Sequence, residues 1–343
     1  MSDHIERLEK YLNAGGQPAD FVSLTADAST REYFRIRWNG QNAIACVYPE
    51  PFDPAGHSYL DSTRLFIAGG LPVAEIIDVD GELGVIVQED FGNRILREEL
   101  VSSPHVSKGS SATRTDRLFG EAISLIARIQ TATDKAFEMR SIASKLRFDK
   151  EKLLWELNFF KTHFFETYLK RPLSSAEDGR LAAEFTDIAR ELESFAAVLC
   201  HRDFHAANLM LDTHGRMRII DHQDARIGSM AYDLVSLLLD RITELPSPEW
   251  LVQKRRYFLD VRRKFGLPKV DEDEFAYEFR LQTIQRCLKA AGTFSFQSAN
   301  RGKDHFIPFI KPMFRISVRG AISLSRFPAI QEILGREMVD DPT

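Results

Sequence analysis

Four short runs within residues 1–91 are rich in apolar, β-branched and aromatic residues, and this composition is typical of strands. Asn39-Gly40 and Asp80-Gly81, which separate neighbouring runs, are dipeptides typical of hairpin turns. Apolar residues at helical spacing predict one amphipathic helix over residues 3–13 and another over residues 57–68. The four runs are Tyr33–Trp38, Ala43–Tyr48, Ala74–Val79 and Gly84–Gln88. The beginning of the chain therefore predicts a small sheet accompanied by helices.

From Gly92 onward the apolar positions follow the longer period of a helix. A stretch rich in Ser and Thr, residues 102–115, has the composition of a mobile surface loop. The predicted helices are 116–131, 149–170, 177–195, 231–242, 249–264, 273–297 and 308–325. Three predicted strands interrupt them, at Ala197–Cys200, Leu209–Leu211 and Met217–Ile220. This part of the chain predicts a helical region that contains a short sheet.

The most informative motif lies among these three strands. Residues 199–224 read LCHRDFHAANLMLDTHGRMRIIDHQD, which contains Asp203, Asn208 and Asp221. The kinase catalytic loop H-R-D-x-x-x-x-N, followed by an Asp on the next turn, has the same spacing. Phosphoryl transfer uses such residues as a carboxylate that orients the attacking hydroxyl and as two oxygen ligands for Mg²⁺. The motif predicts transfer from ATP with Mg²⁺, and three coincident spacings disfavour the alternative of ordinary turn residues.

The composition of the chain indicates which kinds of partner it can bind and in which compartment it works. The net charge of −5 argues against a general binder of nucleic acid or of anionic membranes. The three cysteines are widely separated and form no CxxC pair, which fits a reducing compartment. The sequence begins without the apolar region of a signal peptide, and no apolar run approaches the length of about 20 residues that a membrane helix needs. We therefore expect a cytoplasmic protein that partners neither nucleic acid nor membrane.

Several stretches resemble the aminoglycoside phosphotransferase superfamily, within the protein-kinase-like fold. The strongest similarity is to its branch of N-acetylmuramate/N-acetylglucosamine anomeric kinases of cell-wall recycling. The stretches are DASTREYFRI (27–36, a phosphate-facing hairpin), VIVQEDFG (85–92, the hinge), CHRDFHAANLM with IIDHQDARIGSMAYDLVSL (the catalytic core) and QRCLKAAGTF (285–294, a late helix). The resemblance implies an α+β, two-lobed, protein-kinase-like fold. Residues 1–91 would form a small β-rich N-lobe with the nucleotide-binding sheet and hinge, and residues 92–343 a larger helical C-lobe with the catalytic loop and acceptor site.

The resemblance also implies roles for individual residues. Asp203 would be the catalytic residue that accepts the proton of the acceptor hydroxyl, while Asn208 and Asp221 would be the metal ligands. Backbone groups near Glu89 and Phe91 would bind adenine. The remaining predictions are acceptor contacts for His205, Gln223 and Asp224, and structural roles for His201, Arg202 and Asp233.

One departure from the family concerns the nucleotide phosphates. Family members usually carry a Lys on the third strand, but the corresponding stretch AIACVYPE has none, and DASTR stands in place of a glycine-rich loop. The phosphates still require a cation and hydrogen-bond donors. We expect Arg31 or Arg35 to supply the charge, and Ser29 and Thr30 to supply hydroxyl and backbone donors.

The sequence leaves several acceptors possible. His205, and His222-Gln223 where protein kinases carry Phe-Gly, favour a small-molecule acceptor, in the favoured branch the anomeric hydroxyl of an amino sugar. An antibiotic phosphotransferase or another small-alcohol kinase would share the same core. A nucleotide-binding pseudokinase is favoured by the missing strand Lys but disfavoured by the complete catalytic motif. The sequence does not separate ATP from GTP, nor does it give the oligomeric state.

A last polar set lies on the helix predicted over residues 273–297. Gln285, Arg286 and Lys289 share one side of it, at positions i, i+1 and i+4. They could contact an acidic substrate, but a solvated helix face is the more frequent outcome of such a pattern.

Overall fold

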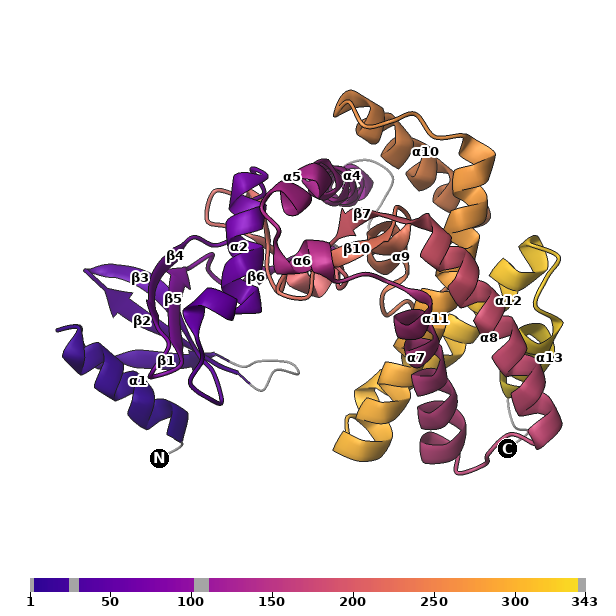
Figure 1. Cartoon of the computed structure of the whole chain (residues 1–343), viewed down its shortest axis with the longest axis horizontal. Helices are drawn as coiled ribbons and strands as arrows, with labels where there is room; N and C mark the ends of the chain where they lie inside the picture. The colour runs from indigo at the N-terminus through magenta and orange to yellow at the C-terminus, as the bar shows by residue number, and fades with distance from the viewer. Residues whose placement is uncertain (1–2, 25–30, 102–110, 339–343) are drawn as a thin grey trace. The chain divides into compact units, whose positions relative to one another are not determined.

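The computed structural model describes residues 3–24, 31–101 and 111–338, and the chain forms two compact units (Figure 1). The sheet unit comprises Met1–Thr115 and Ala206–Asp224, and the helical unit comprises Asp116–His205 and Ala225–Thr343. Because residues 206–224 belong to the first unit, both units are discontinuous in sequence. The sequence places the boundary between two functional lobes after residue 91, and this boundary stays a prediction.

A five-stranded antiparallel sheet with the order β1-β2-β3-β5-β4 forms the centre of the sheet unit. Its strands are β1 (Phe21–Leu24), β2 (Glu32–Trp38), β3 (Gln41–Val47), β4 (Ile76–Asp80) and β5 (Val85–Glu89). Asn39 and Gly40 join β2 to β3 with positive φ angles of 47° and 80°, as a tight hairpin turn requires. The four predicted strands are thus confirmed, while β1 was not predicted.

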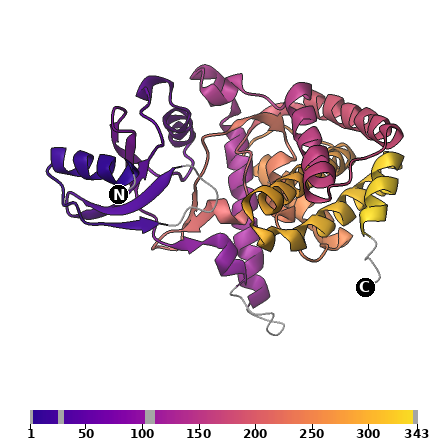
Figure 2. The ribbon, with the colours of Figure 1, turned by 90° about the horizontal axis from the view of Figure 1, so that it is seen from below.

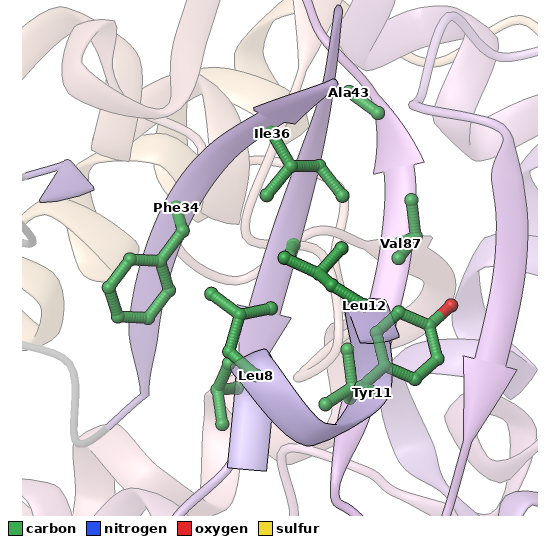
Figure 3. Packing of buried hydrophobic residues seen from close by; sticks show 10 residues of the cluster. Leu8, Tyr11, Leu12, Phe34, Ile36, Ala43 and Val87 are labelled. Carbon is green, nitrogen blue, oxygen red and sulfur yellow. The ribbon is translucent and has the colours of Figure 1, made fainter. Parts of the chain in front are cut away.

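Helix α1 (Asp3–Ala14) covers one face of this sheet because its apolar stripe matches the side chains that alternate toward that face. Figure 3 shows Leu8, Tyr11 and Leu12 of α1 lying against residues of β2, β3 and β5. The opposite face packs against α2 (Ser58–Ala68), whose Tyr59 and Leu60 share a core with β3 and β5. Both helices predicted in this region are confirmed.

A second, three-stranded sheet in the same unit has the order β6-β8-β9. Its strands are β6 (Arg94–Ile95), β8 (Leu209–Leu211) and β9 (Met217–Ile219), flanked by helix α3 (Leu96–Val101) and the 3-10 turn η3 (Ala206–Asn208). Another 3-10 turn, η1 (Pro54–Gly56), precedes α2. The Ile219 N–H donates to Pro72 O at 2.9 Å, so residues from the two parts of the chain join in this unit.

The remaining chain is mostly helical (Figures 1 and 2). Its elements are α4 (Ser111–Thr131), α5 (Thr133–Glu138), α6 (Ile142–Lys145), α7 (Lys150–Lys161), the π-helical turn η2 (Thr162–Tyr168), α8 (Ser175–Phe195), α9 (Tyr232–Leu239), α10 (Pro248–Lys264), α11 (Glu272–Arg301), η4 (Asp304–Phe309), α12 (Ile310–Ser323) and α13 (Pro328–Met338). A two-stranded sheet pairs β7 (Ala196–Cys200) with β10 (Arg226–Ser229). Across the described ranges no helix has the length and apolar character needed to cross a membrane.

The predicted helices of this region are confirmed, with two changes. Of the loop predicted over residues 102–115, residues 102–110 lie outside the described residues, while Ser111 already begins α4. The helix predicted over 149–170 is α-helical only to Lys161, after which the π-helical turn follows. Elements α5, α6, α13 and β10 were not predicted.

Helix α11 passes very close to α7 at Gly292. A Cβ atom added to Gly292 would lie only 2.6 Å from Phe160 Cα and 2.9 Å from Phe160 N, so the two backbones would have to separate. We expect Gly292→Ala to destabilise the protein by about 2 kcal/mol, measured by urea denaturation. The matched control is Gly179→Ala in the exposed part of α8, where no atom beyond the adjacent helix backbone lies within 4 Å of the added Cβ. This control should gain about 0.5–1 kcal/mol, and equal effects of the two changes would contradict the explanation.

Candidate active site

In the helical unit the loop after β7 is fastened by a buried carboxylate. Asp233, in the first turn of α9, accepts hydrogen bonds from the backbone N–H groups of His201 at 2.7 Å and Arg202 at 3.0 Å. Burial raises the pKa of Asp233 to about 6, although His201 and the two N–H groups favour its charged form. Arg202 has a φ of +84°, a left-handed conformation that a non-glycine residue rarely adopts. The carboxylate thus holds the backbone immediately before Asp203.

Asp203 itself is surrounded by cations. Its Oδ1 accepts from Lys289 Nζ at 3.3 Å and lies 3.5 Å from Arg286 Nη2, both on α11. Burial alone would raise the pKa of Asp203, but Lys289, Arg202 and Arg286 together hold it well below its usual range. Asp203 is therefore an ionised hydrogen-bond acceptor.

The polar side of α11 is buried, so its interpretation as a solvated face is wrong. Gln285 is 0% and Arg286 8% exposed, and the Lys289 side chain is 16% exposed. Gln285 donates to Glu156 Oε2 of α7 at 2.8 Å, and Arg286 donates to Ser236 Oγ of α9 at 3.0 Å. Helix α11 contacts α7, α9 and α12, and buried helices of this kind can bury polar residues in side-chain networks. The spacing of these three residues is the same on a buried and on a solvent-exposed helix face, so it could not predict their burial.

In the sheet unit, Asn208 and Asp221 lie together. Asn208 Nδ2 is 3.4 Å from Asp221 Oδ2, and Gln223 Nε2 donates to Asp221 Oδ1 at 2.9 Å. The Ile220 N–H donates to Asn208 O at 3.1 Å, which joins the two segments beside Asp221. Asp221 has a φ of +62°, a conformation that Asp and Asn tolerate better than other non-glycine residues.

These two side chains fit Mg²⁺ rather than a metal held by protein ligands alone. A carboxylate and an amide oxygen are the hard donors that Mg²⁺ prefers, with phosphates and water as further ligands. Among the residues that the structure describes, no group of three or more His, Cys, Asp or Glu could hold a metal ion. The donor set therefore suits a cation that arrives with a nucleotide.

Arg31 is the cation next to this pair. Its Nη2 lies 3.2 Å from Asp221 Oδ1, and its guanidinium carbon lies 5.8 Å and 5.7 Å from the ring centroids of Tyr33 and Tyr48. On β3, Cys46 is the partner of Tyr33 in the sheet, and burial raises the pKa of its thiol to about 12. Strand β3 therefore contributes no charge beside Asp221, and the positive charge there comes from Arg31. Ser29 and Thr30 lie outside the described residues.

Arg35, the other predicted phosphate cation, is bound to the segment that follows β5. Its guanidinium donates to both carboxylate oxygens of Asp90, at 2.6 Å and 3.1 Å, and to Gly92 O at 3.1 Å and Asn93 Oδ1 at 2.8 Å. The Asp90 side chain is 7% exposed. Arg35 thus fixes the predicted hinge, and the two candidate arginines have different surroundings.

The predicted adenine-binding residues Glu89 and Phe91 are held by Arg218 of β9. Arg218 Nη2 donates to Glu89 Oε2 at 2.6 Å, and its guanidinium carbon lies 4.0 Å from the Phe91 ring centroid. The Glu89 N–H already donates to Glu75 O at 3.0 Å, so its backbone donor is used within the sheet unit. Arg218 was not predicted, because an arginine on a short strand has no local pattern that marks its long-range partner.

The three predicted acceptor contacts fall in different places. His205 belongs to the helical unit, and its N–H donates to Asp203 O at 3.0 Å. Gln223 and Asp224 belong to the sheet unit and are partly buried. Between Asp221 and Gln223, His222 is fully buried, and its Nε2 shares a hydrogen bond with Thr63 Oγ1 at 2.8 Å. Contacts of these residues with an acceptor stay predictions.

Sequence comparison places this chain among known proteins. A family model described as the phosphotransferase enzyme family matches residues 20–272. The N-acetylmuramate/N-acetylglucosamine kinase of Neisseria meningitidis serogroup B is 30% identical over 94% of this chain and 92% of its own length. The enzyme of the same name from Pseudomonas aeruginosa is 26% identical over 87% of this chain and 82% of its own length.

Solved structures identify the fold. Choline kinase LicA from Streptococcus pneumoniae superposes with a TM-score of 0.58 at 14% identity, covering 93% of this chain and 98% of its own. The ADP-bound aminoglycoside phosphotransferase APH(2'')-Ib gives a TM-score of 0.54 at 14% identity, covering 91% and 97%. The predicted α+β, protein-kinase-like fold is confirmed.

Proposed function

Because this chain belongs to the phosphotransferase enzyme family, we propose that it transfers the γ-phosphoryl group of ATP to the anomeric hydroxyl of N-acetylmuramate or N-acetylglucosamine. The observation that carries the proposal is the 30% identity with the Neisseria kinase over 94% of this chain and 92% of that enzyme. Use of ATP and of a hydroxyl acceptor follows from the family. The amino-sugar acceptor rests on the four kinases of that name.

Asp203 orients the acceptor in this proposal. Its ionised carboxylate accepts a hydrogen bond from the acceptor hydroxyl, whose oxygen attacks the γ-phosphorus as the bond to the ADP oxygen breaks. The hydroxyl proton then passes to the carboxylate. Because cations hold the pKa of Asp203 low, it is a weak base, which suits a transition state in which the proton leaves late. Orientation is therefore its main contribution.

Asn208 and Asp221 would hold Mg²⁺ through their oxygens, and that ion would neutralise phosphate charge. Arg31 adds a positive charge beside Asp221, where the family usually has a strand Lys. Ser29 and Thr30 would add donors to the phosphates. Adenine would bind at the backbone near Glu89 and Phe91, and the donor would come from Phe91 because the Glu89 N–H is already used.

His205, Gln223 and Asp224 would contact the acceptor sugar. His201, Arg202 and Asp233 would keep the catalytic loop in place, as the hydrogen bonds of Asp233 support. The protein would be cytoplasmic, in keeping with its three buried cysteines, which form no disulfide.

A turnover screen tests this function. The protein is incubated with ATP, Mg²⁺ and, separately, N-acetylmuramate, N-acetylglucosamine, choline and an aminoglycoside, and ADP release is measured together with phosphorus NMR of the products. We expect an anomeric phosphate from an amino sugar and no product from the methyl glycoside of N-acetylglucosamine, in which that hydroxyl is blocked. Turnover of choline or of the aminoglycoside alone would contradict the acceptor. ATP binding without turnover would favour a pseudokinase.

The two arginines give a separate prediction. Arg31→Gln should lower kcat/KM for ATP about 100-fold, because one preorganised cation at the phosphates is lost. Arg35→Gln should lower kcat/KM for ATP much less, by under about tenfold, because it acts only through the hinge that it fixes. It should lower stability by about 1–3 kcal/mol, because Asp90 loses its partner in a buried position. Steady-state kinetics and thermal unfolding of both variants separate the effects. Normal ATP kinetics in Arg31→Gln, or a larger kinetic loss in Arg35→Gln, would show that the assignment is wrong.

A further inference from the structure

The helical unit contains a buried polar cluster around Asp203 that is larger than phosphoryl transfer requires. It comprises Asp203, Arg286, Lys289, Glu156 and Tyr232, contributed by the catalytic loop, α7, α9 and α11. Within the described residues, three of its atoms have no hydrogen-bond partner although their residues are at least nine-tenths buried: Glu156 Oε1, Arg286 Nε and Tyr232 OH. Buried polar atoms are rarely left unpaired in folded proteins, so this cluster has capacity for a polar ligand.

The two cations on α11 are held differently. Arg286 donates to Ser236 Oγ at 3.0 Å, and its guanidinium carbon lies 5.9 Å from the Tyr232 ring centroid, so several groups fix it. The Lys289 ammonium has three donor hydrogens. Within the described part of the chain it donates to Asp203 and to no other group, at a distance of 3.3 Å that is long for a charge-assisted bond. Lys289 therefore has unused donors at the more exposed end of the cluster.

The electrostatics favour an anion beside Lys289. Burial, and then the neighbouring Arg286, lower the pKa of Lys289, and the opposite effects of Asp203 and Glu156 do not offset them. The charged ammonium is thus under-compensated, and a second carboxylate would stabilise it more than a neutral hydroxyl would. A polycationic acceptor would meet repulsion from both Lys289 and Arg286.

Resting on the proposed function, we propose that Lys289 binds the carboxylate of the acceptor sugar, while Arg286 keeps Asp203 in position. N-acetylmuramate differs from N-acetylglucosamine by a lactyl ether that carries this carboxylate. Lys289 would then be the residue that makes the enzyme prefer the acidic sugar, and the neutral sugar would leave its unused donors unpaired.

The wild-type protein allows a test that does not depend on folding of a variant. kcat/KM is measured for N-acetylmuramate, for the same sugar with its carboxyl group converted to the amide, and for N-acetylglucosamine. We expect the amide to lose about tenfold or more relative to the acid, the magnitude of a lost charge-assisted contact. Equal kcat/KM for acid and amide would overturn the inference and leave the proposed function intact.

Variants identify the residue. Lys289→Met should reduce the preference for acid over amide about tenfold or more, mainly through KM for the acid, and Lys289→Arg should restore part of it. Any effect of Lys289 on Asp203 is common to both acceptors and cancels in this ratio. The matched control is Lys161→Met on α7, since that side chain is 18% exposed and likewise makes one ion pair, with Asp178.

The possible results distinguish failure of the inference about Lys289 from failure of the proposed function. A preference that survives Lys289→Met would assign the carboxylate to another residue and overturn the inference. A loss equal for acid and amide would show that Lys289 only positions Asp203, which also overturns it. Turnover of neither sugar by the wild-type protein would instead overturn the proposed function, and the inference with it.

Discussion

Replacement of Asp203 by Asn is expected to lower kcat for sugar phosphorylation about a thousandfold, with little change in KM for ATP. The amide has nearly the same shape, but it lacks the charge that orients the acceptor hydroxyl and it cannot take up the proton. Because the cations of α11 hold the pKa of Asp203 well below its usual range, the carboxylate is ionised at neutral and mildly acidic pH. The ratio of wild-type to variant kcat should therefore be constant over that range, measured by coupled ADP release.

Two comparisons make this prediction specific. Asp187→Asn, at an exposed position of α8 that pairs with Arg190, should keep full activity. The Asp203→Asn protein should also remain folded, as circular dichroism would show, although Arg286 and Lys289 lose their common anion. A variant that is folded and retains more than about a tenth of wild-type kcat would exclude Asp203 from the orienting role.

Asp221→Asn should have the second largest effect, because it removes the one full negative charge from the proposed Mg²⁺ ligands. We expect kcat to fall at least about a hundredfold and the Mg²⁺ concentration for half-maximal activity to rise at least about tenfold. Asn is a suitable replacement because it tolerates the φ of +62° and can still accept hydrogen bonds from Gln223 and Arg31. The measurement is ATP turnover as a function of Mg²⁺ concentration.

The control for this variant is Asp20→Asn, an exposed carboxylate in the same unit. It should leave the Mg²⁺ dependence unchanged, which would rule out a general effect of net charge. If Asp221→Asn lowered kcat but kept the wild-type Mg²⁺ dependence, Asp221 would act through Arg31 rather than through the metal.

Much of the fold could be predicted from local patterns. The β-rich runs of β2 to β5, the Asn39-Gly40 turn and the long amphipathic helices are encoded within short windows of sequence. Strand β10 could not be predicted in this way, since RIGS has no alternation and becomes a strand through its pairing with β7. Helix α13 begins at Pro328 and has only 11 residues, so its apolar periodicity extends over few turns.

In the candidate site, too, the residues marked by a local pattern could be predicted, and those that depend on long-range contacts could not. Asp203, Asn208 and Asp221 were recognised because their spacing in one segment is itself the signal. The pairing of Arg35 with Asp90 spans 55 residues and the pairing of Arg31 with Asp221 spans 190, so no local pattern could separate the roles of the two arginines. Burial of Lys289 likewise depends on helices that contact α11 from distant parts of the chain.

The return of residues 206–224 to the sheet unit has a consequence for how the protein is made. During synthesis the first 115 residues emerge before β8 and β9 have been translated. Strand β6 and the Pro72 carbonyl therefore lack their hydrogen-bond partners until about ninety further residues have been added. No single cut in the chain yields two intact units, and a fragment that ends at Thr115 should be prone to proteolysis and aggregation. Truncation experiments on this protein therefore require that the two segments of the sheet unit be expressed together.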